Sequence, residues 1–192
     1  KKLKNYRLTN DSQKFFLLKK IGVDFIINKS FDLKFSRITS KQFIKNIITK
    51  KINPKFIFVS NNFKYGNKRK GDVKELISEG KKYGFKIIKP EPLRVKKKII
   101  SSSLIRGLLE KGKIKQANKL LSRNWVINGS VQRGRQLGKK LGFPTCNIDI
   151  NNYISAKPGV YSIKVTIDNS KKILNGIAYL GYRPTFGGKK LL

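Results

Sequence analysis

Residues 56–89 read FIFVSNNFKYGNKRKGDVKELISEGKKYGFKIIK and contain one strand–helix–strand pattern. The apolar run Phe56 to Val59 is typical of a buried strand. After a loop that contains glycine, Asp72 is placed to begin a helix that Gly84 ends, with apolar residues at helical spacing between them. Phe85 to Lys89 is then another strand. Strands that alternate with helices at this spacing predict a parallel α/β sheet of the nucleotide-binding type.

The residues before this unit extend the same pattern. Phe15 to Val23 has the apolar spacing of a helix, and Asp24 to Asn28 is typical of a short buried strand. Ser40 is placed to cap a further helix. The apolar residues of that helix share one face, as in an amphipathic helix; they are Phe43, Ile44, Ile47 and Ile48.

The pattern changes near residues 122–124. Before that point, a helix is expected between Ser103 and Gly112 and another over about 114–121. After Trp125, apolar and polar residues alternate, most clearly in residues 160–167 and 173–180 on either side of Asp168-Asn169-Ser170. This alternation predicts a β-hairpin in an antiparallel sheet or barrel. We therefore predict two domains, residues 1–122 and 123–192.

Composition excludes several classes of protein. The 192 residues carry a net charge of +35, yet 39% are hydrophobic, which is enough for a folded core. Apolar runs are too short to span a membrane and no signal peptide begins the chain, so a soluble cytoplasmic protein is expected. One Cys and no His exclude an internal disulfide, a His-based zinc site and a His base. Because Met is also absent and the chain begins at Lys1, we expect a fragment of a longer reading frame.

The positive charge has two interpretations. Clustered Lys and Arg neutralise phosphates, so a basic RNA-binding or ribosome-associated protein is one hypothesis. However, 36 of the 45 basic residues are Lys and they are spread along the chain. The clusters 68–70 and 96–98 lack the Arg forks and exposed aromatics that read bases. A solvated surface is the alternative that we favour, and it would also attract a small anionic substrate.

Residues 134–147, GRQLGKKLGFPTCN, are the most informative for chemistry. Glycines in a basic loop let backbone N–H groups approach a polyphosphate, although a plain basic turn is the alternative. The spacing is not that of a Walker A motif. The Thr and Asn near its end offer oxygen ligands for Mg²⁺. The segment therefore predicts an ATP–Mg²⁺ site that includes Gly134, Arg135, Gly138, Lys140, Gly142, Pro144, Thr145 and Asn147.

Four motifs carry a resemblance to a known family. Residues 134–147 resemble the glycine-rich loop and Pro-Thr-Ala-Asn motif of riboflavin kinase, with Cys146 in the usual Ala position. Residues 183–187, RPTFG, match another kinase segment. Residues 100–106, ISSSLIR, are similar to the Ile-Ser-Ser-Thr-x-Ile-Arg motif of FMN adenylyltransferase, and residues 62–72 resemble that module's Phe-x-Phe-Gly and Arg-x-Gly-Asp stretches. The chain thus resembles the bacterial bifunctional riboflavin kinase/FAD synthetases over nearly its whole length.

The resemblance implies an α/β plus β fold. Residues 1–122 would be part of a Rossmann-like nucleotidyltransferase domain, and residues 123–192 part of an antiparallel riboflavin kinase-like β-barrel, both incomplete. The implied function is FAD biosynthesis: phosphorylation of riboflavin to FMN, then adenylylation of FMN to FAD. Mg²⁺ is the implied cofactor, and ATP, riboflavin and FMN are the implied substrates. No specific nucleic acid is expected, and the sequence does not indicate an oligomeric state.

The resemblance also assigns site residues. Ser101, Ser102, Ser103 and Arg106 would bind a triphosphate at a helix N-terminus, which is physically reasonable because free amides and a cation meet there. A Ser N-cap with an exposed Arg is the alternative. The flavin-side residues would be Asn62, Phe63, Tyr65, Gly66, Arg183 and Thr185. For the aromatic pair the alternative is packing in the core, and for the Arg it is a surface ion pair.

Two departures from the family concern catalysis. The adenylyltransferases carry a His-x-Gly-His motif, and this chain has no His. The kinases carry a catalytic Glu after the Arg-Pro-Thr-Phe segment, and here no Glu follows Glu110. We therefore expect no catalytic residue within these 192 residues and no turnover by this segment alone. Ser60, where Gly is usual, and Ser103, where Thr is usual, affect fine geometry only.

Overall fold

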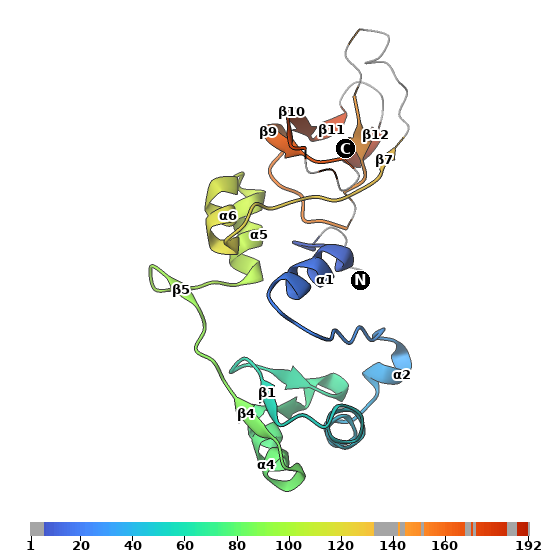
Figure 1. Cartoon of the computed structure of the whole chain (residues 1–192), viewed down its shortest axis with the longest axis vertical. Helices are drawn as coiled ribbons and strands as arrows, with labels where there is room; N and C mark the ends of the chain where they lie inside the picture. Colours follow the sequence, from blue (N-terminus) through green and yellow to red (C-terminus); the bar gives the residue numbers. More distant parts are fainter. Residues whose placement is uncertain are drawn as a thin grey trace. The chain divides into compact units, whose positions relative to one another are not determined.

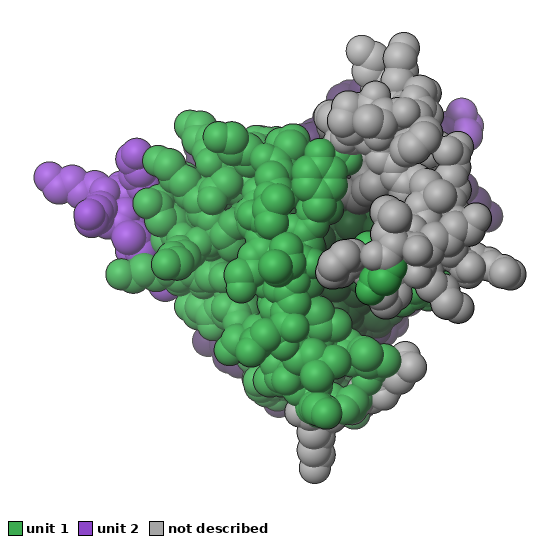
Figure 2. Space-filling model, turned by 90° about the horizontal axis from the view of Figure 1, so that it is seen from above, with its two compact units in different colours: residues 1–24, 100–192 green, residues 25–99 purple. Residues whose placement is uncertain are grey.

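The computed structural model describes residues 6–132, 142, 145–150, 152–167, 170, 172–183 and 188–191. The chain divides into two compact units, which Figure 1 traces and Figure 2 colours separately. Unit 1 combines Lys1–Asp24 with Ile100–Leu192, and unit 2 is Phe25–Ile99. The chain therefore begins in unit 1, forms unit 2 and returns to unit 1. The division at residue 122 that the sequence predicts concerns two modules along the chain and stays a prediction.

Unit 2 has mixed helices and strands. Its elements are α2 (Leu33–Ser36), α3 (Ser40–Gln42), η1 (Phe43–Ile52), β1 (Phe56–Phe58), β2 (Lys64–Tyr65), η2 (Asn67–Arg69), β3 (Gly71–Asp72), α4 (Val73–Tyr83), β4 (Lys86–Ile88), β5 (Arg94–Val95) and β6 (Lys98–Ile99). The predicted helix between Asp72 and Gly84 is confirmed, since Asp72 caps α4 and Gly84 ends it with a left-handed backbone.

Strands β1 and β4 are parallel, as the sequence predicts, with Ile57 opposite Ile87. These two half-buried side chains pack against a core of Ile44, Tyr65, Leu76 and Phe85. The prediction of a buried strand at residues 56–59 holds for one face only, because Phe56 is 54% and Phe58 is 66% exposed. Among the described residues this sheet has two strands, and one of its faces carries the core.

The predicted helix after residue 40 forms, but its cap is Thr39 rather than Ser40. The Thr39 side chain accepts from the N–H of Gln42, and the Gln42 side chain accepts from the N–H of Thr39. Such a capping box needs Gln or Glu three residues after the cap. Gln42 satisfies this for Thr39, whereas Phe43 follows Ser40 at that distance, so the reciprocal bond selects Thr39. The helix continues as the π-helix η1.

Residues 24–28 do not form the buried strand that their apolar character predicts. Phe25 is 90% and Ile27 is 75% exposed. A strand needs a neighbour to satisfy its backbone N–H and C=O groups, and no bridge joins these residues to another described segment. The helix expected over Phe15 to Val23 forms, but as α1 (Asp11–Lys20), which begins and ends earlier than predicted.

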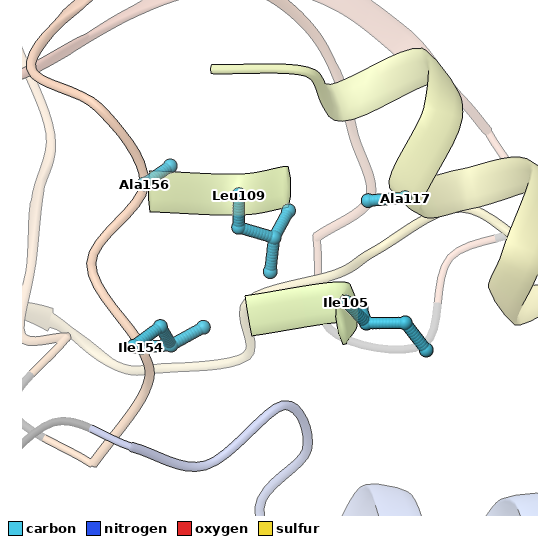
Figure 3. Packing of buried hydrophobic residues seen from close by; sticks show 5 residues of the cluster. All are labelled: Ile105, Leu109, Ala117, Ile154 and Ala156. Atoms are coloured by element: carbon cyan, nitrogen blue, oxygen red, sulfur yellow. The ribbon is translucent and has the colours of Figure 1, made fainter. Parts of the chain in front are cut away.

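Unit 1 contains α1, α5 (Ser102–Glu110), α6 (Ile114–Leu121), β7 (Val131–Gln132), β8 (Asn147–Ile148), β9 (Gly159–Val165), β10 (Leu174–Leu180), β11 (Tyr182–Arg183) and β12 (Gly188–Leu191). Helices α5 and α6, which match the predicted ranges closely, supply much of its core. Figure 3 shows the cluster of Ile105, Leu109, Ala117, Ile154 and Ala156. Because two of these residues lie between β8 and β9, the core joins the helices to the strand region.

The predicted hairpin is confirmed: β9 and β10 pair antiparallel over their full length, with Ser162 opposite Ile177. Asp168 and Asn169 of its connection lie outside the described residues. Strand β7 pairs with β8 and β11 with β12, both antiparallel. Each sheet in the described part of the chain has two strands, so these residues do not close the predicted barrel. Within the same part, no helix is long and apolar enough to cross a membrane.

Candidate functional site

The two ends of the glycine-rich segment are held together. Val131 lies opposite Ile148 and Gln132 opposite Asn147 in the β7–β8 pair. Just before β7, a Cβ placed on Gly129 would lie 2.5 Å from Ile148 Cγ2, so only glycine fits there without a shift. We call residues 129–132 and 147–148 the loop neck. Five predicted site residues lie beyond the neck and outside the described residues: Gly134, Arg135, Gly138, Lys140 and Pro144.

The described part of this segment offers oxygen ligands. Thr145 is exposed and Asn147 is half-buried, and Cys146 between them is an exposed free thiol. Gly142 has a φ of +80° and open space around the position of a Cβ, so its backbone conformation is what favours glycine.

The donor set near the neck fits Mg²⁺ delivered with a nucleotide. No group of three or more His, Cys, Asp and Glu that suits a metal occurs among the described residues. Mg²⁺ keeps several waters and is commonly held by a few protein oxygens together with substrate phosphates. A Thr hydroxyl and an Asn amide oxygen suit that role because the phosphates supply the negative charge.

The second predicted phosphate site lies at the start of α5. Ser101 caps the helix, its Oγ accepting from the N–H of Leu104 over 3.2 Å, and Ser102 and Ser103 are exposed beside it. The Nε of Arg106 donates to the carbonyl oxygen of Tyr6 over 2.7 Å, and its guanidinium lies 5.6 Å from the centre of the Tyr6 ring. Arg106 is therefore held beside the helix by the N-terminal segment of unit 1.

The predicted flavin-side turn lies in unit 2. Asn62 is exposed, and its Oδ1 accepts from the Ser60 hydroxyl over 2.9 Å. Phe63 is half-buried and stacks on Tyr65, with ring centres 5.6 Å apart and an angle of 18°. Tyr65 is only 6% exposed and belongs to the core. The structure thus brings the three residues together, with Asn62 on the surface and Tyr65 beneath.

A carboxylate that the sequence did not single out anchors this turn. Glu75 Oε2 accepts from the Tyr65 hydroxyl over 3.2 Å, and Oε1 accepts from the Ser40 hydroxyl over 2.9 Å. Burial and then the negative charge of Glu75 raise the pKa of the Tyr65 hydroxyl above its ordinary value. The only signal in the sequence is that Glu75 follows the cap Asp72 by three residues, which predicts a helix start and no contact with Tyr65.

Glycines bring the turn close to Ser40. A Cβ on Gly66, whose φ is +72°, would lie 2.6 Å from the Ser40 nitrogen. A Cβ on Gly71 would lie 2.7 Å from both Ser40 Cβ and the Tyr65 ring. Real Cβ atoms do not tolerate such distances, so the close packing of these segments requires glycine at both positions.

Asp72 connects the turn to helix α4. Its Oδ1 accepts from the N–H of Glu75 over 3.0 Å, and its Oδ2 lies 3.4 Å from Lys64 Nζ. The backbone hydrogen bond lowers the pKa of the Asp72 carboxyl, and the nearby Lys64 lowers it further. The carboxylate thus caps the helix and pairs with β2 across the same short hairpin.

The last two predicted flavin-side residues lie near the C-terminus. Arg183 ends β11, which pairs with β12. Thr185 lies outside the described residues.

Comparison with known proteins gives one consistent family assignment. The FAD synthetase family model matches residues 1–104, and the riboflavin kinase model matches residues 121–192. A protein of Buchnera aphidicola subsp. Schizaphis graminum named bifunctional riboflavin kinase/FMN adenylyltransferase is 38% identical over 96% of this chain and 59% of its own length. An Escherichia coli K12 protein of the same name is 34% identical over 95% of this chain and 58% of its own.

A solved structure is also similar. It is described as a macrolide-efflux protein from Streptococcus pneumoniae, with a TM-score of 0.78 and 27% identity over 96% of this chain and 59% of its own. The chain therefore spans about three fifths of the length of the relatives that it matches. With its first 104 residues fitting the FAD synthetase model and its last 72 following the riboflavin kinase model, this chain belongs to the FAD synthetase family.

Proposed function

We propose that this protein acts in FAD biosynthesis, with residues 123–192 serving riboflavin phosphorylation and residues 1–122 serving adenylylation of FMN. The observation that carries this proposal is the succession of two family matches on one chain, FAD synthetase and then riboflavin kinase. It is supported by relatives named for both activities. In the first reaction the γ-phosphoryl group of ATP passes to the ribityl 5′-hydroxyl of riboflavin, which gives FMN and ADP. In the second, FMN receives the AMP part of ATP and pyrophosphate leaves.

The kinase half is proposed to hold ATP at the glycine-rich segment. Phosphoryl transfer depends mainly on positioning and on neutralising charge. Backbone N–H groups of Gly134, Gly138 and Gly142 would face the phosphates, together with the side chains of Arg135 and Lys140. Pro144 would restrict the backbone that leads into β8. The paired β7 and β8 support this role because they fix both ends of the segment.

Mg²⁺ would be held by Thr145 and Asn147 with the phosphate oxygens of ATP, and would neutralise charge on the transferring group. The protein's own contribution at this site is to position the nucleotide. Arg183 and Thr185 are proposed to contact the flavin in the same half.

The adenylyltransferase half is proposed to bind the second ATP at the start of α5. The exposed Ser102 and Ser103 lie at a helix N-terminus, where free N–H groups favour an anion. Arg106, already held by Tyr6, would present a fixed positive charge. The flavin would lie against Asn62, Phe63 and Gly66, with Tyr65 supporting Phe63 from below.

Binding measurements test this function directly. We expect the purified chain to bind Mg-ATP and riboflavin in calorimetric titrations, and Thr145→Ala and Asn147→Ala to weaken ATP binding by about tenfold or more, because each removes a contact to a charged ligand. Thr166→Ala is the matched control, because Thr166 is an exposed threonine outside the site. Because these residues hold no His and no Glu after Glu110, we expect chromatography of incubations with Mg-ATP to show no FMN or FAD, and formation of either would contradict the expectation of no turnover by this segment. A chain that binds neither ATP nor flavin would contradict the proposal.

The salt dependence of RNA binding distinguishes the RNA-binding hypothesis from the proposed function. Counterion release makes RNA binding fall steeply with salt concentration. We expect weak binding to RNA in a filter assay at physiological salt, and tight, steeply salt-dependent binding would favour the alternative instead.

A further inference from the structure

A buried polar cluster joins three distant segments of unit 1. Tyr153 is 2% exposed and Gln13 is 9% exposed. The Tyr153 hydroxyl donates to Gln13 Oε1 over 3.0 Å and accepts from the N–H of Asn128, also over 3.0 Å. Helix α1, the residues before β7 and the residues after β8 therefore meet at one hydroxyl group. We call Gln13, Asn128 and Tyr153 the polar hub.

The hub requires an amide at position 13. Gln13 Oε1 accepts from the N–H of Asn10 over 3.0 Å as well as from Tyr153, and Nε2 donates to the carbonyl oxygen of Val126 over 2.9 Å. Its oxygen thus faces two donors and its nitrogen faces an acceptor, which fixes the orientation of the amide. A carboxylate at this position would place an oxygen against the Val126 carbonyl oxygen. Both would then lack a hydrogen-bond donor, and a buried polar group without a partner lowers the stability of the folded protein.

Neighbouring contacts hold the same segments. The indole Nε1 of Trp125 donates to the carbonyl oxygen of Leu8 over 3.1 Å. The N–H of Ile154 donates to the carbonyl oxygen of Arg7 over 2.8 Å. Trp125 and Val126 are therefore attached directly to the N-terminal residues, and Asn128 is attached to them through Tyr153.

The hub lies next to the loop neck in the chain. Asn128 directly precedes Gly129, the residue that packs on Ile148. An extended segment that is held at one end keeps little freedom over the next few residues, so a fixed Asn128 limits where β7 can begin. Because β7 pairs with β8, the hub limits through the backbone where the loop neck lies, including Asn147.

We propose that Gln13 and Tyr153 are positioning residues for ATP at Thr145 and Asn147, the candidate ligand residues at the loop neck. Gln13 lies within the FAD synthetase match, whereas Asn128 and Tyr153 lie within the riboflavin kinase match. The N-terminal module thereby supports the nucleotide site of the C-terminal module. This inference rests on the proposed function in one respect, namely that Thr145 and Asn147 bind ATP with its Mg²⁺.

The structural half of the proposal is tested by amide hydrogen exchange on the full chain. Gln13→Glu replaces the donor to Val126 by an acceptor, and Tyr153→Phe removes only the hydroxyl. We expect the amides of residues 126–132 and 147–148 to exchange about tenfold faster in either variant, the effect of losing one buried hydrogen bond. Lys14→Gln on the exposed face of α1 is the matched control. Exchange in residues 25–99 reports whether a variant has unfolded as a whole.

The functional half is tested by titration with Mg-ATP under the same conditions. We expect both hub variants to weaken ATP binding by about tenfold while Lys14→Gln binds as the unsubstituted chain does. Unchanged exchange at the neck overturns the inference, and so does faster exchange with unchanged ATP affinity, which would make the hub merely structural. If the unsubstituted chain binds no ATP, the proposed function fails. Amide exchange at the loop neck alone then decides whether the hub positions the loop neck.

Discussion

The hydroxyl of Tyr65 donates to Glu75 over 3.2 Å from inside the core of unit 2. The same carboxylate accepts from Ser40 over 2.9 Å, so it binds the start of one helix and the proposed flavin-side turn together. The arrangement places an ionisable hydroxyl of an otherwise apolar cluster against a negative charge. Its consequence is that the neutral form of Tyr65 is strongly favoured in the folded protein.

We predict that Tyr65 makes unit 2 less stable in alkali. Its folded-state pKa is raised, so its contribution to stability is complete below the unfolded pKa of about 10 and is lost as the pH rises above it. Denaturant unfolding between neutral pH and pH values above about 10 measures this loss. Tyr65→Phe should be less stable at neutral pH by about 1 kcal/mol, because Glu75 loses a donor, and should show a smaller alkaline loss. Tyr6→Phe, at an exposed ring, is the control, and an equal alkaline loss in Tyr65→Phe would contradict the prediction.

We predict that the Asp72 carboxylate contributes to the loss of stability of unit 2 at acidic pH. The pKa of its carboxyl is lowered in the folded state, chiefly by the N–H of Glu75, so the stability that it provides is present above the unfolded pKa near 4 and is lost as the pH falls through the folded value. Asp72→Asn keeps a capping oxygen without the charge and should flatten the acid profile. Asp72→Ala should be less stable at every pH because the cap is lost. Identical acid profiles for Asp72→Asn and the unsubstituted chain would show that the carboxylate has no such role.

Replacing each of two helical glycines by alanine should change the stability of the protein in opposite directions. Gly80 in α4 lies against Phe85, where a Cβ would be 2.6 Å from the Phe85 carbonyl oxygen. Gly107 in α5 has open space. Gly107→Ala should stabilise the protein by about 0.5–1 kcal/mol, the ordinary helix preference. Gly80→Ala should destabilise it by about 1–3 kcal/mol, because the clash outweighs that preference. Thermal unfolding of the two variants checks the difference, and stabilisation by both would mean that Phe85 can move away freely.

A pair of substitutions in the loop neck tests whether contact with Ile148 is the reason for glycine at position 129. Gly129→Ala places a Cβ 2.5 Å from Ile148 Cγ2 and should loosen the β7–β8 pair. Because the clashing atom belongs to a side chain, Ile148→Ala in the same chain removes it. We expect faster exchange of the protected amides of the β7–β8 pair in Gly129→Ala, and protection restored in the double variant, with Ile148→Ala alone close to the unsubstituted chain. A double variant that remains loose would mean that the position needs glycine for another reason.

Local patterns in the sequence predicted the helices well. The ends of α4 follow from Asp72 and Gly84, and the range of α6 matches the expected one. These elements depend on caps and on spacing within a few residues, which the sequence displays directly. The start of the helix near residue 40 differs by one residue, since the reciprocal bond between Gln42 and the cap favours Thr39 over Ser40. Helix α1 begins and ends earlier than its apolar spacing predicts.

Burial was predicted less well. Phe56 and Phe58 are apolar and lie in a strand as expected, yet both are exposed. Residues 24–28 have the composition of a strand and do not form one. An apolar residue is buried only where another segment packs against it. That segment is often far away in sequence, so local composition does not show whether it is present.

The amino-acid sequence alone established the family through the order of its motifs, the strand–helix–strand unit, the β9–β10 hairpin and the chemical types of the candidate site residues. Only the tertiary structure revealed that Glu75 anchors Tyr65 and that Gln13 reaches Tyr153, across a sequence separation of 140 residues. The reason is physical: caps and periodicity are properties of adjacent residues, whereas a buried hydrogen bond depends on which distant segments pack together, and no local pattern encodes that choice.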